Sequence, residues 1–227
     1  MRSQTLCVLA VLAAGACAPP PPDPQPQPNT TAAPAPAAEV DPERIRRIRP
    51  ELPDGYEVAD VGGYASSPVA FWGFGRGWTA EPPQCATLVD PAPDGAALGV
   101  SGSGAGGIIH VVVVTLPAGG QGPIGLDPVR LGECGRWTMS YGSSSADVSL
   151  VDAPVIEGAA TLGTSSTIRN VVESDTETDS RADTFMALLS RYVVFVTLVT
   201  DPGSVEPPLP PQYASDLLVR TVATLRG

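Results

Sequence analysis

The sequence contains no lysine: all 13 of its basic residues are arginine, against 24 acidic residues and a formal net charge of −11. So acidic a surface repels phosphate backbones and anionic lipid, which argues against nucleic acid as a partner. Histidine occurs once, at His110, which excludes a zinc site built from several histidines. Arginine without lysine, together with abundant alanine, glycine, proline and valine, is typical of a GC-rich genome such as that of an actinobacterium.

Long hydrophobic runs are also missing. A transmembrane helix needs about 20 apolar residues, and the run near the N-terminus covers only residues 6–14. It follows Arg2 and leads to Ala14-Gly15-Ala16-Cys17, where small residues precede a cysteine. This pattern predicts a signal peptide over residues 1–16 and a lipidated Cys17. Lipidation would hold the protein in the cell envelope, on the outer face of the cytoplasmic membrane. Ordinary cleavage, the alternative, would release it.

Proline is concentrated in the segment that follows. Nine of the residues from 18 to 40 are proline, and a segment of this composition samples extended polyproline conformations and builds no core. We therefore expect a Pro/Ala-rich stalk over residues 17–40, beginning with the lipidated cysteine, and one globular domain over residues 41–227. Roughly 185 residues are enough for a domain with a sizeable core.

Few cysteines remain for that domain. Cys7 lies in the leader and Cys17 is the lipidation site, which leaves Cys85 and Cys134. Because exported proteins meet an oxidising environment, these two are predicted to form a disulfide. Closing a loop of about 50 residues would stabilise the fold by roughly 4 kcal/mol. The alternative is two unrelated buried thiols.

The distribution of apolar residues predicts an α+β domain, an antiparallel sheet with helices packed on one face. The run at 108–116 is apolar on both faces and indicates a central strand. Ala214, Leu218, Val222 and Leu225 form a stripe at helical spacing that predicts a terminal helix from about residue 212. Further strands are expected at 56–61, 137–141, 146–151, 161–172, 184–189 and 192–200, and short helices at 41–49, from 82, and at 127–133.

Motifs that carry chemistry are weak in this chain. Gly102-Ser103-Gly104-Ala105-Gly106-Gly107 matches the dinucleotide fingerprint, but a strand follows it where that motif needs a helix, so a flexible loop is expected. The serines form no nucleophile elbow. His110 is expected on the same face of its strand as Val112 and Val114, as a hydrogen-bonded core residue or as a base in a pocket.

Five acids follow the strand predicted at 161–172 but lack the glycine and the bidentate acid of a calcium loop, so a solvated hairpin loop is expected. They are Glu173, Asp175, Glu177, Asp179 and Asp183.

The most informative segment is Phe71-Trp72-Gly73-Phe74-Gly75-Arg76-Gly77-Trp78. Residues 56–78 hold six of the 12 aromatic residues of the chain. Alternating glycines allow close backbone approach, and aromatics beside an arginine suit a groove for a sugar, lipid or anion. The candidate ligand-binding residues are Trp72, Phe74, Arg76, Trp78 and His110. The alternative is a glycine-rich flap that contributes aromatic side chains to the core.

The order of several features resembles a family of mycobacterial and other actinobacterial cell-envelope lipoproteins, similar in turn to the extracellular sensor domain of PknH-type receptor kinases. These features lie in residues 41–227: Pro53-Asp54-Gly55-Tyr56 before a strand, Pro82-Pro83-Gln84-Cys85 opening a helix, Cys134-Gly135-Arg136-Trp137 entering a strand, and Leu217-Leu218 in the last helix. The resemblance implies an α+β domain with a ligand cleft. The kinase domains carry two disulfides, and this chain has cysteines for one.

Together these observations predict a lipid-anchored envelope protein whose extracytoplasmic domain binds or senses a small molecule, glycan or lipid in a cleft. No catalytic residues, metal ligands or cofactor are assigned, and the chain is not expected to be an enzyme. The alternative is a scaffolding lipoprotein that binds an envelope protein and no small ligand.

Overall fold

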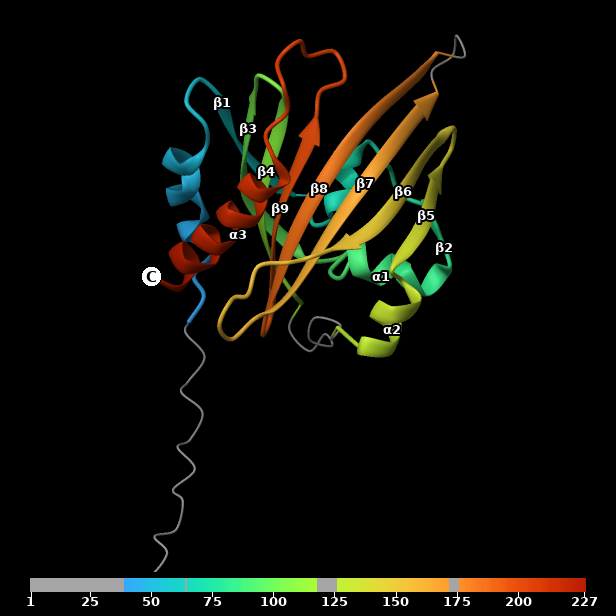
Figure 1. Cartoon of the computed structure of the whole chain (residues 1–227). Coiled ribbons are helices and arrows are strands. Elements are labelled where there is room, and N and C mark those ends of the chain that lie inside the picture. Colours follow the sequence, from blue (N-terminus) through green and yellow to red (C-terminus); the bar gives the residue numbers. More distant parts are fainter. Residues whose placement is uncertain (1–38, 64, 118–125, 172–175) are drawn as a thin grey trace, which may run out of the picture. The chain divides into compact units, whose positions relative to one another are not determined.

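The computed structural model describes residues 39–63, 65–117, 126–171 and 176–227. Nine strands form one antiparallel sheet in the order β1-β3-β4-β9-β8-β7-β6-β5-β2 (Figure 1). The strands are β1 Glu57–Gly63, β2 Thr79–Glu81, β3 Ala96–Gly104, β4 Gly107–Thr115, β5 Arg136–Tyr141, β6 Ser144–Val151, β7 Ala160–Val171, β8 Glu177–Leu189 and β9 Tyr192–Thr200. The helical segments are η1 Pro42–Glu51, η2 Pro68–Trp72, η3 Pro83–Cys85, α1 Ala86–Val89, α2 Pro128–Glu133 and α3 Pro211–Arg226.

Strands β4 and β9 are neighbouring inner strands of the sheet and are buried over most of their length. Alternate residues of β4 enter two separate apolar clusters, Val111 and Val113 on one face and Val112 and Val114 on the other. A strand covered on both faces has to be apolar throughout. The predicted central strand at 108–116 is therefore confirmed.

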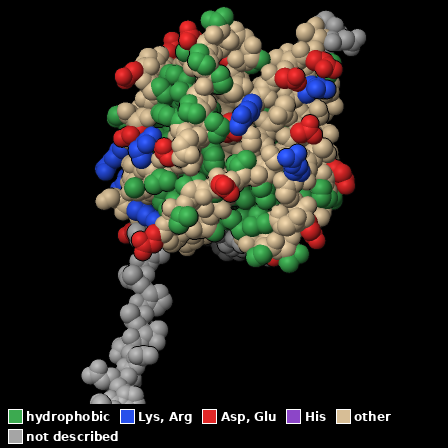
Figure 2. Space-filling model, viewed as in Figure 1, with side chains coloured by type: hydrophobic (Ala, Val, Ile, Leu, Met, Phe, Trp, Pro, Cys, Tyr) green, Lys and Arg blue, Asp and Glu red, His purple; other side chains and the backbone are tan. Residues whose placement is uncertain are grey.

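Helix α3 and the 3₁₀ helix η1 cover the first face of the sheet (Figure 1). The predicted stripe of α3 is buried from Ala214 to Leu225, and full burial of one leucine stabilises a fold by about 1.5–3 kcal/mol. The Tyr213 hydroxyl donates a hydrogen bond of 2.6 Å to the carbonyl of Glu51, which joins α3 to the end of η1. On the side that carries α3, basic and acidic side chains are interspersed (Figure 2).

The second face is covered by the chain between β1 and β3. Strands β1 and β2 lie at opposite edges of the sheet, so residues 65–78, which include η2, have to cross this face. The chain then returns through η3 and α1 to β3, beside β1. Val69, Trp72 and Leu88 from this excursion share one apolar cluster with Phe195 of β9.

The α+β class, the antiparallel sheet and the single disulfide are confirmed. Helices were expected on one face only, but short helical segments also cover the second face. They are η2, which was not predicted, and η3 with α1, which match the helix expected from residue 82. Side-chain caps begin two of the expected short helices: Asp41 accepts from the backbone N–H of Glu43, and Asp127 from that of Val129. None of the helices in the described ranges is long and apolar enough to cross a membrane.

Two predicted loops are in part strands. Gly102 and Gly104 belong to β3, and only Ala105-Gly106 turns the chain into β4. A side chain at Gly104 would collide with the ring of Tyr56, which packs against this strand. The glycines therefore permit a close approach rather than flexibility.

The acidic stretch is the second of these loops. Glu177, Asp179 and Asp183 lie in β8, which pairs with β7 from residue 177 to residue 188, while Glu173 and Asp175 lie outside the described residues. Pairing with β7 therefore decides the conformation of residues that disfavour strands by themselves. The predicted signal peptide, Cys17 and most of the stalk also lie outside the described residues.

Candidate functional site

A cleft of about 940 Å³ opens beside η2, on the second face of the sheet. We call it the second-face cleft. Its walls come from three stretches: the chain around η2, the chain between α1 and β3, and the end of β5. The lining residues are Gly63, Ser66, Ser67, Ala70, Gly73, Phe74, Gly75, Arg76, Gly77, Trp78, Asp90, Pro93, Asp94, Gly95 and Tyr141.

One wall of the second-face cleft is aromatic. Phe74 is buried, and its ring stacks with that of Tyr141 at a centroid distance of 6.0 Å and an interplanar angle of 30°. Tyr141 remains 37% exposed, and Trp78 is half-buried. A β-carbon at position 75 would collide with the Tyr141 hydroxyl, so Gly75 allows this approach. The wall thus offers ring surface and a phenolic hydroxyl to a ligand.

Arg76 supplies the positive charge of the cleft. It is exposed and makes no ion pair with any residue in the described ranges. The flanking Gly73 and Gly77 have φ angles of 85° and 89°, which only glycine adopts without strain. The chain can therefore turn sharply on each side of Arg76 and present the guanidinium to solvent in the cleft.

Two carboxylates supply negative charge. Asp90 caps the C-terminus of α1, where its backbone N–H donates to the carbonyl of Ala86 at 3.1 Å. Burial raises the pKa of Asp90 to about 6, a hydrogen bond from Ser67 lowers that pKa, and the nearby charge of Asp94 raises it. The buried Oδ1 atom of Asp90 has no hydrogen-bond partner among the described residues. The residue as a whole is only half-buried and lines the cleft, so its carboxyl group can accept a hydrogen bond from a ligand.

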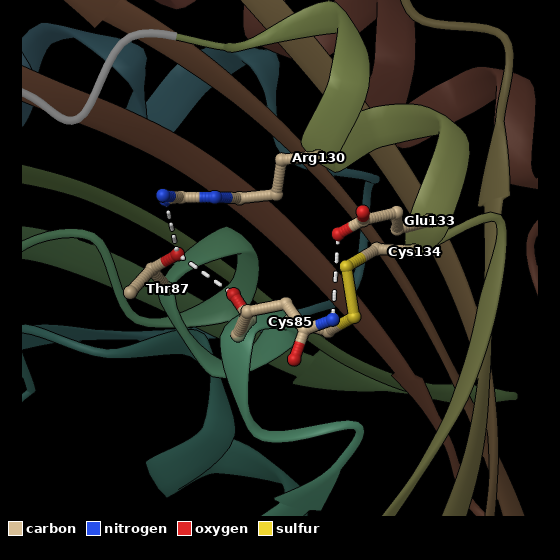
Figure 3. Close-up of a disulfide and its surroundings, with 6 residues drawn as sticks. Cys85, Thr87, Arg130, Glu133 and Cys134 are labelled. Carbon is tan, nitrogen blue, oxygen red and sulfur yellow. Dashed lines mark hydrogen bonds between the residues drawn. A yellow bond between two sulfur atoms is a disulfide. The ribbon is translucent and has the colours of Figure 1, made fainter.

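The disulfide holds the chain that carries Asp90. Cys85 and Cys134 are joined, as predicted, with their Cα atoms 5.6 Å apart (Figure 3). Two hydrogen bonds near the disulfide join the same two segments, from Gln84 to Glu133 at 3.4 Å and from Arg130 to Thr87 at 3.1 Å. The start of α1 is thereby fastened to α2.

The predicted site residues separate into two groups. Phe74, Arg76 and Trp78 line the second-face cleft, but Trp72 and His110 do not. Trp72 is buried, and its indole N–H donates to the hydroxyl of Thr197 at 3.4 Å. The aromatic segment from Phe71 to Trp78 therefore combines the two alternatives that the sequence left open. It lines a cleft, and it also contributes aromatic side chains to the core.

His110 lies behind η2 rather than in the cleft. The ring of Phe71 covers its imidazole with centroids 3.8 Å apart, and burial lowers the pKa of His110 to about 4. Its Nδ1 atom is buried without a hydrogen-bond partner in the described part of the chain. The predicted position on the face of Val112 and Val114 is correct, but the expected hydrogen bond to the ring is not found at this atom.

His110 belongs to a polar row that runs across five neighbouring strands on the second face. The row has one residue from each strand, and each residue lies directly opposite the next on the neighbouring strand. In order across the sheet they are Ser101, His110, Thr197, Thr184 and Thr164. The hydroxyls of Thr184 and Thr197 are hydrogen-bonded at 2.6 Å. Thr164 is fully buried, and its hydroxyl has no partner in the described ranges. η2 lies between this row and the second-face cleft, with Ala70 on the cleft side and Phe71 on the row.

Sequence reasoning missed Asp90, Asp94 and Tyr141. The two acids frame the turn Asp90-Pro91-Ala92-Pro93-Asp94-Gly95, which by composition indicates only a loop. Their contact with a cleft depends on the return of the chain across the sheet.

Comparisons with known proteins assign the chain to a family. Residues 41–226 match the family described as Domain of unknown function (DUF5642), so the chain belongs to that family. A comparison with curated proteins finds no match.

Two solved structures share the fold. The Rv0999 ortholog from Mycobacterium smegmatis is 20% identical, with a TM-score of 0.63 over 83% of this chain and 98% of that one. The extracellular domain of PknH from Mycobacterium tuberculosis is 15% identical, with a TM-score of 0.52 over 82% of this chain and 97% of that one. These likenesses confirm the predicted resemblance at the level of fold.

Proposed function

We propose that this member of the DUF5642 family is an extracytoplasmic, sensor-like domain that binds a ligand in its second-face cleft and is held at the membrane through a lipid on Cys17. The observation that carries the proposal is the cleft itself. It combines exposed aromatic surface, an arginine that makes no ion pair in the described ranges, and a half-buried carboxyl whose Oδ1 atom has no hydrogen-bond partner there. Unsatisfied polar groups beside apolar surface are typical of ligand sites.

Two further observations support the location outside the cytoplasm. A disulfide fastens one wall of the cleft, and structural disulfides persist in exported proteins. The fold is also shared with a domain described as extracellular, that of PknH.

Native mass spectrometry tests the binding proposal directly. The protein would be purified from an actinobacterial envelope and measured intact and after denaturation. A reproducible adduct that denaturation removes is the expected result. A Trp78→Ala variant should lose the adduct because Trp78 lines the cleft, whereas Arg47→Ala, on η1 over the opposite face, should keep it.

A clean mass in wild type, with a specific protein captured by crosslinking in the envelope, would contradict ligand binding and favour the scaffolding alternative. Trp72→Ala is unsuitable for this test. Trp72 is buried in the core, so its truncation should destabilise the fold by about 3–5 kcal/mol whatever the ligand.

A further inference from the structure

The charges of the second-face cleft restrict the chemistry of its ligand. Arg76 donates hydrogen bonds, while Asp90 and Asp94 accept them when ionised. A simple anion would satisfy the guanidinium and be repelled by the carboxylates, and a simple cation would meet the reverse problem. Hydroxyl groups both donate and accept, so a polyhydroxylated molecule matches all three side chains without carrying charge.

The aromatic wall adds a second restriction. Trp78 and Tyr141 present partly exposed rings in the same cleft, and an aromatic face pairs well with a flat apolar surface. A sugar ring has such a surface in its C–H face, with hydroxyls around its edge. A small zwitterion would use the charges of the cleft but would leave the rings uncovered.

The size of the cleft gives the third restriction. Its volume of about 940 Å³ lies at the upper end of the roughly 300–1,000 Å³ found for small-ligand sites. Resting on the proposed function, we infer that the second-face cleft takes a neutral oligosaccharide of a few sugar units. A sugar ring stacks on Trp78 and Tyr141, and its hydroxyls bridge Asp90 and Arg76.

Saturation-transfer NMR and calorimetry on the folded domain test this inference. The sugar probes are neutral trisaccharides of glucose, mannose, galactose and arabinose in α and β linkage. The comparison probes are 1,4-diaminobutane, the dipeptide Ala-Ala and dodecanoate. We expect saturation transfer to at least one trisaccharide and to none of the comparison probes. Trp78→Ala and Asp90→Ala should each lower the affinity for that trisaccharide at least tenfold. The affinity of Arg47→Ala should agree with that of wild type within twofold.

The pH dependence separates a sugar from a cation. Asp90 lines the cleft together with Asp94, Arg76 and Tyr141. Burial raises the pKa of Asp90 to about 6, so this carboxyl gains a proton between pH 7.5 and pH 5. A sugar hydroxyl pairs with Asp90 in either form, so we expect the affinity for the trisaccharide to change less than threefold. The affinity for a cation that pairs with ionised Asp90 should instead fall by up to about tenfold at pH 5.

Other outcomes overturn the inference in distinguishable ways. Binding of diaminobutane, Ala-Ala or dodecanoate that depends on Trp78 and Asp90, with no trisaccharide bound, would refute the sugar and leave the binding function standing. Trisaccharide binding unaffected by Trp78→Ala and Asp90→Ala would refute its placement in this cleft. No bound probe together with a clean native mass would refute both the sugar and the proposed function.

Discussion

The ring of Phe71 lies on the imidazole of His110, with centroids 3.8 Å apart and planes inclined by 19°. Phe71 belongs to η2 and His110 to the central strand β4, so this contact fastens the chain that borders the second-face cleft to the sheet. The imidazole is kept neutral by its surroundings, since burial lowers its pKa to about 4.

Because the folded state disfavours protonated His110, the fold should become less stable on acidification. The unfolded chain binds this proton near pH 6.5 and the folded chain near pH 4, so the free energy of unfolding falls as the pH drops through this window. Between pH 7.5 and 5 this loss should be about 2 kcal/mol. His110→Phe should remove it, as urea unfolding of both proteins at the two pH values would reveal. The same pH dependence in wild type and variant would contradict this assignment.

Asp90 should act in the opposite sense. Its pKa is raised to about 6 in the fold from 3.8, so its contribution is fully present below pH 3.8 and is lost as the pH rises through 6. At pH 7.5, Asp90→Asn should therefore stabilise the domain by about 1–2 kcal/mol, after allowance for partial exposure. Exposed Asp94 provides the control, because Asp94→Asn should change thermal stability little. Destabilisation by Asp90→Asn would show that the carboxylate supports the fold.

The polar row offers a matched pair of threonines. Thr197→Val removes the partner of the Thr184 hydroxyl and of the Trp72 indole N–H, and should cost about 2–3 kcal/mol in the free energy of unfolding. Thr164 is equally buried but has no hydroxyl partner in the described ranges, so Thr164→Val should be neutral or stabilising. Chemical denaturation of both variants measures the difference. Equal losses would mean that packing, rather than hydrogen bonding, governs this row.

Alkylation of the denatured, unreduced mature domain should leave Cys85 and Cys134 unmodified, and reduction should expose both, which intact mass would register. The bond closes a sequence separation of 49 residues. The double variant Cys85→Ser/Cys134→Ser should therefore lose about 4 kcal/mol of stability through the greater entropy of its unfolded chain. Two alkylated cysteines without reductant would rule out the bond in the native protein.

The lipid anchor remains a prediction from residues 1–17. Cys17→Ala should move the protein from the membrane fraction of its host to the soluble fraction, because several acyl chains are needed for stable anchoring. Fractionation followed by immunoblotting measures this shift, and the mass of the N-terminal peptide would identify the lipid. An unchanged membrane fraction would mean that another feature retains the protein.

Interactions between residues close together in the sequence were sufficient to predict most of the helices and strands. The apolar run of β4, the stripe of α3 and the caps at Asp41 and Asp127 each depend on residues close together in sequence. Strands β2 and β3 were not predicted. β2 has three residues, too few for an alternating pattern, and the glycines of β3 resemble those of a loop.

The sequence by itself determined that the chain forms one α+β domain with a disulfide between Cys85 and Cys134. The spacing of apolar residues and the number of cysteines can both be read without knowing the fold. Only the tertiary structure decided that β1 and β2 occupy opposite edges of the sheet. That order makes the aromatic segment cross the second face and brings Arg76, Asp90 and Tyr141 to one cleft. These three residues are brought together by pairing between strands that are far apart in the sequence. Local sequence patterns therefore cannot predict that they share a cleft.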